Sequence, residues 1–443
     1  MIPAVRPTAR HFVRAHRLPA AAWLCGLGAP GAACATMGEG PVTGEVSGYA
    51  ESRHQGVLGL DPDFADLAAV FPDGYHPENR YGAIERLRPT LKLHVGQDAT
   101  LVATGEARTA HGFFDTNQTE LGDVVSVERF YLTATAEDWD HTAGKQNIVW
   151  GSGLLLNPTD LFNDKNPADL QAERPGLWAL KSLWAVNDHT NLTFVAAMTE
   201  ETCCAATVIS RFDTTLDNTD LAVEAAWDAG REVGIVGVDV RTELTVGLWL
   251  EAAATVPKNS PSDTTTSVEA GLDYSFDVLQ ALYLAGEYMY QQSGLERPGE
   301  QFDLANLQAS ATAGSSPEAA FAESFRNRRM FMGRHYGVAV IRLEIGSDWR
   351  AQLVNVTHLG DRTGLVVPQV SWLPAEAWTL TLGAQVTYGE SGGEYTMTLP
   401  ELTPPQEQFI SAASPTLGPA LVSLQGARLT PAASVFLWGR YAW

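Results

Sequence analysis

The chain has 443 residues, of which 52 are acidic and 29 are basic, so its formal net charge is −23 at neutral pH. This balance argues against a nucleic-acid partner, because phosphate binding requires a basic surface. The sequence has no run of about 18 uninterrupted apolar residues, so it contains no helical membrane span. A β-barrel stays possible, since its strands show only alternating hydrophobicity.

Residues 1–35 have the pattern of a secretory signal peptide. Basic residues from Arg6 to Arg17 precede a short apolar stretch at 18–33, and residues 33–35 form a small-x-small cleavage site. Lipid modification of Cys34 is the alternative. Removal of the signal leaves 25 basic and 52 acidic residues, a net charge of −27.

Two of the four cysteines fall in the signal, and the remaining pair, Cys203 and Cys204, is adjacent in sequence. Adjacent cysteines cannot join distant segments, so the pair is either a strained bridge or two thiols, and as a metal signal it is weak. We therefore expect no metal and no cofactor.

Taken in chain order, the rest of the sequence consists of short segments with strand-like alternation. The predicted strands span 42–53, 86–95, 100–108, 124–134, 139–150, 177–186, 191–199, 206–212, 221–227, 233–240, 243–254, 267–276, 281–291, 336–345, 350–359, 366–372, 378–388 and 435–443. Residues 421–429 are a further strand or the upper part of the last one, and residues 407–413 form a helical turn.

One face of these strands is apolar and the other carries charges. In 86–95, leucines and valine alternate with Arg88, Thr90, Lys92 and His94. A water-filled lumen explains the charged face, and lipid explains the apolar one. The connections alternate between short turns and longer loops, as in outer-membrane barrels. The sequence predicts an all-β fold, a closed antiparallel transmembrane β-barrel of about 18 strands, with 16 as the alternative, short periplasmic turns and long outer loops.

Residues 151–175 form a loop that is too long for a hairpin turn, and loops of this length are usually functional or disordered. Its apolar residues, Leu154–Leu156 and Leu161–Phe162, give it a reason to pack against the barrel. We predict that the loop folds into the lumen and narrows the pore; the alternative is that its charges face external water. The predicted constriction residues are Asp160, Asp164, Lys165, Asp169, Glu173 and Arg174.

Charged residues at alternate strand positions are predicted to line the lumen, where charge and diameter set selectivity. These wall residues are Arg88, Lys92, Arg129, Lys145, Lys181, Glu243, Glu251, Glu269, Asp273, Glu287 and Arg342, and His94 and His141 are placed there too.

The chain ends in alternate apolar residues and a terminal aromatic residue, from Val435 to Trp443. This ending resembles that of Gram-negative outer-membrane proteins, which implies that Tyr441 and Trp443 serve as a signal to the barrel-assembly machinery. A finer resemblance is to a largely uncharacterised porin-like family with the pattern G-K-Q-x-x-x-W-G followed by N-P-x-D. It is carried by Gly144, Lys145, Gln146, Trp150, Gly151, Asn157, Pro158 and Asp160.

These features predict a porin-like channel of the bacterial outer membrane for small hydrophilic solutes or ions, surrounded by lipid and lipopolysaccharide. The acidic loops favour the passage of cations. The sequence does not decide whether the chain forms a homo-oligomer. A structural or adhesive barrel without transport is the alternative. An outer-membrane hydrolase is less favoured, because neither G-x-S-x-G nor H-E-x-x-H occurs, so we expect no enzyme activity.

Overall fold

The computed structural model describes residues 35–37, 42–58, 81–112, 122–162, 176–198, 206–278, 280–296, 331–398, 404–413, 430 and 432–443. The strands are β1 (Ala35–Met37), β2 (Val42–Leu58), β3 (Tyr81–Val95), β4 (Ala99–Gly112), β5 (Gly122–Ala136), β6 (Trp139–Gln146), β7 (Leu177–Asn187), β8 (Thr190–Met198), β9 (Ala206–Leu216), β10 (Thr219–Asp228), β11 (Val233–Glu243), β12 (Gly247–Pro257), β13 (Thr265–Phe276), β14 (Ala281–Gln291), β15 (His335–Ile345), β16 (Trp349–His358), β17 (Thr363–Ala375), β18 (Trp378–Tyr388) and β19 (Ala433–Ala442). The helices are η3 (Pro261–Asp263), η5 (Glu394–Thr396) and α4 (Pro404–Ala413).

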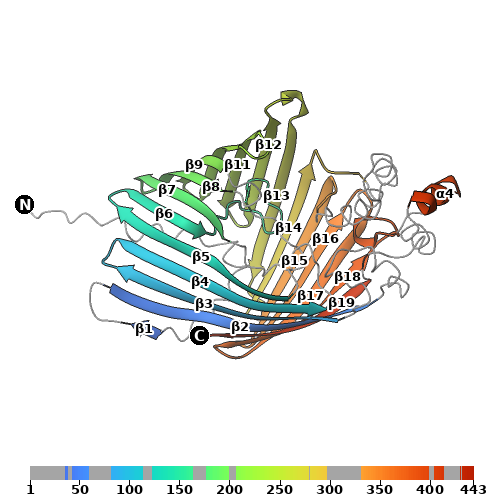
Figure 1. Cartoon of the computed structure of the whole chain (residues 1–443), viewed down its shortest axis with the longest axis horizontal. Helices are drawn as coiled ribbons and strands as arrows, with labels where there is room; N and C mark the ends of the chain where they lie inside the picture. Colours follow the sequence, from blue (N-terminus) through green and yellow to red (C-terminus); the bar gives the residue numbers. More distant parts are fainter. Residues whose placement is uncertain are drawn as a thin grey trace, which may run out of the picture. The chain divides into compact units, whose positions relative to one another are not determined.

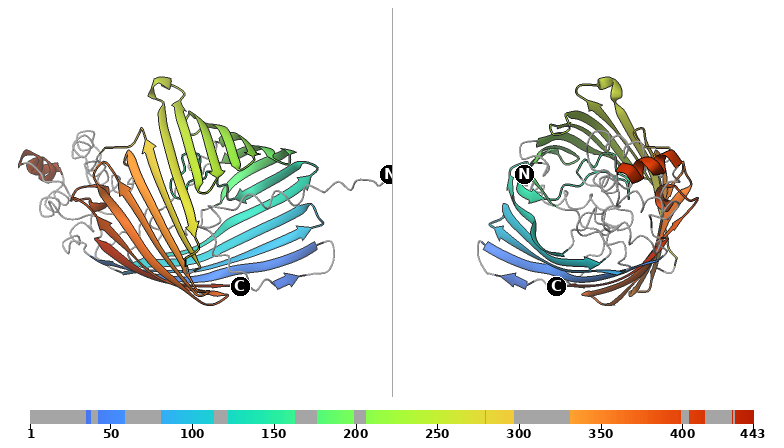
Figure 2. Two further views of the ribbon diagram at one scale, coloured as in Figure 1. Left: turned by 180° about the vertical axis from the view of Figure 1, so that it is seen from behind. Right: turned by 45° about the vertical axis from the view of Figure 1, so that its right-hand side comes forward.

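The strands form one antiparallel sheet in which each strand from β2 to β19 pairs with its neighbours in chain order. β19 also pairs with β2, with Leu437 opposite His54, so 18 strands close into a ring (Figures 1 and 2). The short β1 pairs with the beginning of β2. The prediction of a closed antiparallel barrel of 18 strands is therefore confirmed, and α4 covers the predicted helical turn.

The chain divides into two compact units. Unit 1 comprises Met1–Ser47, Thr90–Thr104 and Val127–Asp273, and unit 2 comprises Gly48–Pro89, Gly105–Ser126 and Tyr274–Trp443. In the part of the chain that the structure describes, no helix is long and apolar enough to cross a membrane.

The connections follow the predicted alternation. Turns of two to four residues join β3 to β4, β5 to β6, β7 to β8 and so on to β17 and β18. Gly96 and Gly346 lie in two of these turns with φ of 64° and 61°, a left-handed conformation that strains residues with a Cβ. The connections at the other ends of the strands include residues 147–176, 292–334 and 389–432.

In unit 1 the exposed face of the strands is apolar, and the buried face carries charged residues together with apolar ones. On β10 and β11, Val223 and Val236 are exposed, whereas Glu224 and Asp239 are buried. In unit 2, Ile341 is exposed beside the buried Arg342 on β15, and Leu382 is exposed beside the buried Thr381 on β18, although Val338 and Val340 are also buried on β15. We call the face with exposed hydrophobic residues the outer face and the opposite one, which lies inside the closed ring, the inner face. This arrangement inverts that of a soluble sandwich.

Several predicted strand boundaries are wrong: β2 and β3 each extend five residues beyond a predicted end, and two other predicted strands run into a turn or a loop. The segment 243–254 was predicted to be one strand, but Glu243 ends β11, and Leu244–Val246 form a tight turn closed by a hydrogen bond from the Leu244 N–H to the Val246 carbonyl. The segment 139–150 ends as a strand at Gln146. In both places the alternation of side chains continued through a change of backbone direction, which periodicity alone does not detect.

A buried polar network in unit 2 fastens η5 to the loop ends of β15, β16 and β17. The Tyr336 hydroxyl donates to Glu394 Oε2 at 2.6 Å, and the Glu394 N–H donates to Asp361 Oδ2 at 2.8 Å. The fully buried His358 lies 2.9 Å from Asp361 Oδ1, which also accepts from the Thr363 hydroxyl at 2.8 Å. Burial would raise the pKa of Asp361, but hydrogen bonds from His358, Glu394 and Thr363 outweigh burial and lower the pKa to about 2.

Replacing Asp361 with asparagine is expected to lower stability in a pH-dependent way. The folded-state pKa lies below the unfolded value of about 3.9, so the carboxylate contributes about 2 to 3 kcal/mol above pH ~4 and loses this contribution as the pH falls through about 2. Thermal unfolding of both proteins at neutral and strongly acidic pH measures the difference, which should shrink in acid. Asp348→Asn, in an exposed turn, is the control, and an equal pH-independent loss in both variants would contradict the assignment.

Candidate pore constriction

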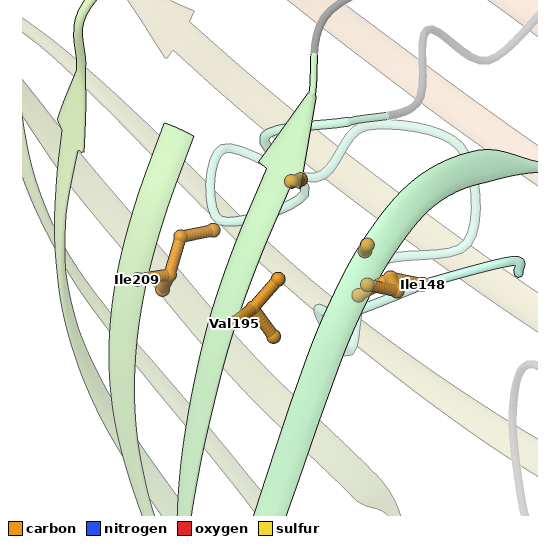
Figure 3. Close-up of a cluster of buried hydrophobic side chains, with 5 residues drawn as sticks. Ile148, Val195 and Ile209 are labelled. Atoms are coloured by element: carbon orange, nitrogen blue, oxygen red, sulfur yellow. The ribbon is translucent and has the colours of Figure 1, made fainter. Parts of the chain in front are cut away.

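The segment after β6 turns onto the inner face of unit 1 because its apolar residues pack there. Ile148 is buried against Val195 and Ile209 of β8 and β9 (Figure 3). Trp150 and Phe162 pack against the same cluster, with their ring centroids 6.2 Å apart. The apolar residues at both ends of the segment 151–162 therefore hold it on the barrel wall.

Glu251 of β12 is the main polar anchor of this segment. Its Oε1 accepts from the Gly153 N–H at 2.7 Å, and its Oε2 accepts from the Thr159 hydroxyl at 2.7 Å and from the Thr159 N–H at 3.3 Å. Glu251 is 0% exposed, so its carboxylate is fully occupied by the segment. A charged acceptor forms strong hydrogen bonds in such a site, and these bonds offset part of the cost of burying the charge.

Glycine is required at Gly151, beside this carboxylate. Gly151 has a φ of +90°, and a Cβ there would lie 2.8 Å from Glu251 Oε1. The adjacent Ser152 hydroxyl donates to Asp239 Oδ1 at 2.6 Å. The Gly-Ser-Gly sequence that follows Trp150 thus lets the backbone approach two wall carboxylates closely.

Asp239 belongs to a buried charge network centred on Arg211. Arg211 donates to Asp213 Oδ1 at 2.8 Å and to Glu224 Oε2 at 2.9 Å, and its Nη2 lies 3.5 Å from Asp239 Oδ2. The guanidinium also lies 5.4 Å from the Trp150 ring centroid, within the range of a cation–π contact. The Arg211 guanidinium therefore contacts three carboxylates of the barrel wall and also Trp150, at the beginning of the loop.

A second network lies on β11, β12 and β13. Trp249 donates from Nε1 to Glu269 Oε1 at 2.8 Å, and Arg241 donates to Glu243 Oε1 at 2.8 Å. Arg241 Nη2 also lies 3.5 Å from Asp273 Oδ2. Glu269 is 0% exposed, so this carboxylate supports the wall rather than facing open water.

Of the predicted constriction residues, only Asp160 lies in the described part of the chain. It is buried, and its N–H donates to the Asn157 carbonyl at 3.1 Å, which closes the end of the segment. The predictions for Asp164, Lys165, Asp169, Glu173 and Arg174 fall outside the described residues, as do those for residues 1–34 and for the cysteine pair.

The predicted wall residues divide into three groups. Strand alternation and contacts place Arg88, Lys92, Lys181, Glu243, Glu251, Glu269, Asp273, Glu287 and Arg342 on the inner face. Arg129 is half-buried on β5. Lys145 is on the outer face, because it pairs with Trp178, an exposed residue, while its neighbour Gln146 is buried.

His141 is likewise on the outer face, paired with Ser182 and stacked on Trp139. The prediction that Lys145 and His141 of β6 line the lumen was therefore wrong. Polar side chains stand on both faces of this strand, so its sequence does not show which face points inward, and an error of one residue exchanges the two faces.

Sequence reasoning identified only Arg88 of an arginine cluster on the inner face of unit 2. Arg440 donates to Glu51 Oε2 at 2.6 Å, and the Arg88 and Arg86 guanidiniums each lie 3.4 Å from Glu106 Oε2. The whole cluster contains five arginines and two glutamates: Arg53, Arg86, Arg88, Arg108, Arg440, Glu51 and Glu106. Their alternate spacing on β2, β3, β4 and β19 was visible, but the pairing that gathers them joins residues up to 389 positions apart.

Within the described residues, no group of three or more His, Cys, Asp or Glu side chains is placed to hold a metal ion. In the networks described above, carboxylates pair with arginines, and these pairs form the polar inner face of the barrel.

Comparison with known proteins points to one fold. No protein-family model matches the chain, and no curated protein matches its sequence. The outer membrane protein OprD from Pseudomonas aeruginosa is similar in structure, with a TM-score of 0.52 and 7% identity over 90% of this chain and 94% of OprD. A doubly substituted OccD1 (OprD) gives a TM-score of 0.50 and 9% identity over 90% of this chain and 95% of that one. The chain has the fold of an outer-membrane protein. At these identities, the likeness concerns the fold alone.

Proposed function

We propose that this chain is a porin-like channel of the bacterial outer membrane through which small hydrophilic solutes or ions diffuse. The observation that carries the proposal is a closed ring of strands with exposed hydrophobic residues outside and buried charged residues inside. Such a ring places its outer face in hydrocarbon and its inner face around an aqueous path. The fold shared with OprD supports this proposal.

In this proposal, Gly151–Phe162 is the constriction element, and the rest of the loop to residue 175 extends it. Support comes from the attachment of the segment to Glu251 and Asp239 of the inner face. The resemblance of Gly144–Asp160 to a porin-like family agrees with a common role for this segment. Residues 1–35 act as the export signal, and Tyr441 and Trp443 as the signal to the assembly machinery.

Planar-bilayer recording of the purified protein tests the channel. We expect steady single-channel openings in a simple salt. A protein that is folded and inserted but silent would support a structural barrel instead.

The same recording under a salt gradient gives the reversal potential, which reports whether the channel prefers cations or anions. The acidic loops favour cations, whereas the arginine cluster, with five guanidiniums and two carboxylates, favours anions. Replacing Arg108 with glutamine is expected to shift the reversal potential toward that of a more cation-selective channel, since it removes a positive wall charge. Arg231→Gln, in the turn between β10 and β11, should leave the potential unchanged, and an equal shift in both variants would contradict a role of the cluster in selectivity.

A further inference from the structure

The beginning of the connection between β18 and β19, residues 389–398, lies on the inner face of unit 2. Its helix η5 is buried throughout and forms hydrogen bonds with Tyr336 and Thr363 of the wall. Both of these residues pair with His358, and all three side chains are 0% exposed. Tyr336 shares the face of β15 with Arg342, which is the inner face. We call residues 389–398 the strap, because they lie across the loop ends of β15, β16 and β17.

Glu394 fastens the strap to two other connections. Its Oε2 accepts from the Tyr336 hydroxyl at 2.6 Å, and its Oε1 accepts from the N–H of Met332, near the end of the connection 292–334, at 3.2 Å. The Glu394 N–H donates to Asp361, in the turn between β16 and β17, at 2.8 Å. One residue therefore joins three connections at the loop ends of the strands.

Glycine residues allow the two longer connections to approach the wall this closely. A Cβ at Gly393 would lie 2.2 Å from Thr363 Cγ2, and a Cβ at Gly333 would lie 2.2 Å from His358 Cδ2. A side chain at either position would push its connection away from the wall. The sequence of both connections therefore permits the contact that Glu394 fastens.

The fastening residue is ionisable, and its burial couples the strap to pH. Glu394 is 4% exposed. Burial raises the pKa of Glu394, and this effect exceeds the lowering by the Tyr336 hydroxyl and the nearby His358, while Asp361 raises the pKa further. These three groups, from β15, β16 and the turn after β16, face Glu394 together with the adjacent Tyr395.

The sign of this coupling follows from the two positions of the strap. When the strap leaves the wall, Glu394 returns to water, where the pKa of a glutamate is about 4.3. The carboxyl group binds a proton more tightly on the wall than in water, so closure of the strap takes up a proton. Acid therefore favours the closed strap, and a rise in pH favours its release.

We propose that Glu394 is a latch that holds the strap over the inner face of unit 2 and releases it when the carboxyl group loses its proton. The closed strap narrows the path beside β15–β17, and the released strap widens it. The inference rests on the channel proposed above, because the strap restricts passage only if the barrel encloses an aqueous path. The latch is separate from Gly151–Phe162, since its residues belong to unit 2.

Hydrogen exchange of the full chain in detergent tests the latch without reference to conduction. From about pH 8 to about pH 5, the protection of the N–H groups in 389–398, corrected for intrinsic exchange, should rise by up to about tenfold per pH unit, because closure takes up one proton. In Glu394→Gln the protection should not vary with pH, since the amide has a similar shape and no proton to lose. Glu390→Gln is the matched control, because Glu390 is exposed in the same segment and its loss should leave the pH dependence unchanged.

Two further variants identify the group that titrates. Tyr336→Phe removes a hydroxyl that favours the ionised carboxylate, so the midpoint should move to higher pH, and this test holds even if Glu394→Gln does not fold. His358→Gln should keep a pH-dependent protection. Protection that does not change with pH in the unaltered protein, or a pH dependence that survives Glu394→Gln, would overturn the latch.

Planar-bilayer recording over the same pH range connects the latch with the channel. The single-channel conductance should fall as the protection of the strap rises, and it should not vary with pH in Glu394→Gln. A conductance that ignores the change in protection would overturn the restriction of the path by the strap. Silent barrels with pH-dependent protection would refute the channel and support the latch, whereas conducting barrels with constant protection would refute the latch and support the channel.

Discussion

Replacing Glu251 with leucine is expected to release the segment 151–162 from the barrel wall and to raise the single-channel conductance. The substitution removes the acceptor of the Gly153 N–H, the Thr159 N–H and the Thr159 hydroxyl. Buried donors that lose their acceptor cost about 1–3 kcal/mol each, so the attachment should weaken by about 3 kcal/mol or more after relaxation toward water. The strand pairings do not depend on this carboxylate, so the barrel should stay closed.

Glu243→Leu is the matched control for this prediction. Glu243 lies on the same face, but it is exposed and its hydrogen bonds come from Arg241. Planar-bilayer recording of both variants gives the conductance, and protease sensitivity of residues 151–162 reports release of the segment. If Glu251→Leu conducts like the unaltered channel while the barrel remains folded, the segment is not a constriction held by Glu251.

Replacing Arg211 with methionine is expected to give the largest loss of stability. Arg211 is buried and holds Asp213, Glu224 and Asp239 together on three strands. Removal of one partner of a buried ion pair costs about 3–5 kcal/mol, because the remaining charges have no compensating partner. Asp239 also accepts from Ser152, so the loss should reach the base of the loop.

Thermal unfolding in detergent, followed by the heat-dependent shift of the barrel on a gel, measures this loss. Arg231→Met is the control, because the Arg231 side chain is 62% exposed in the turn after β10 and its partner Asp228 keeps the hydrogen bonds from the Gly230 and Arg231 N–H groups, so its loss should cost only about 1 kcal/mol. A second substitution, Glu224→Met, should recover part of the stability in the Arg211→Met background, because it removes one of the unpaired carboxylates. Equal losses for Arg211→Met and Arg231→Met would show that the network does not stabilise the wall.

The sequence predicted the architecture because side chains in a strand alternate with period two. Along β13, Glu269 and Asp273 were assigned to the polar face and Leu272 to the apolar one, and the structure agrees. The alternation of short turns with longer connections predicted a closed ring, since antiparallel strands return to the same end at every second connection. These features depend on neighbours in sequence.

The sequence alone could not predict which inner carboxylates remain open to the lumen. Glu251 lies on the inner face, where a segment 98 residues earlier in the chain covers it, and no local pattern encodes that contact. Similarly, Arg440 joins the arginine cluster of β2, β3 and β4 only because β19 returns to β2.

The sequence by itself determined the strand periodicity and, for most strands, the polar and apolar faces, because these follow from the local geometry of extended chain. Only the tertiary structure decided the burial of Glu251 and the outward position of Lys145. Each of these depends on the register between strands and on packing by residues distant in sequence, and a shift of one residue in register exchanges the two faces.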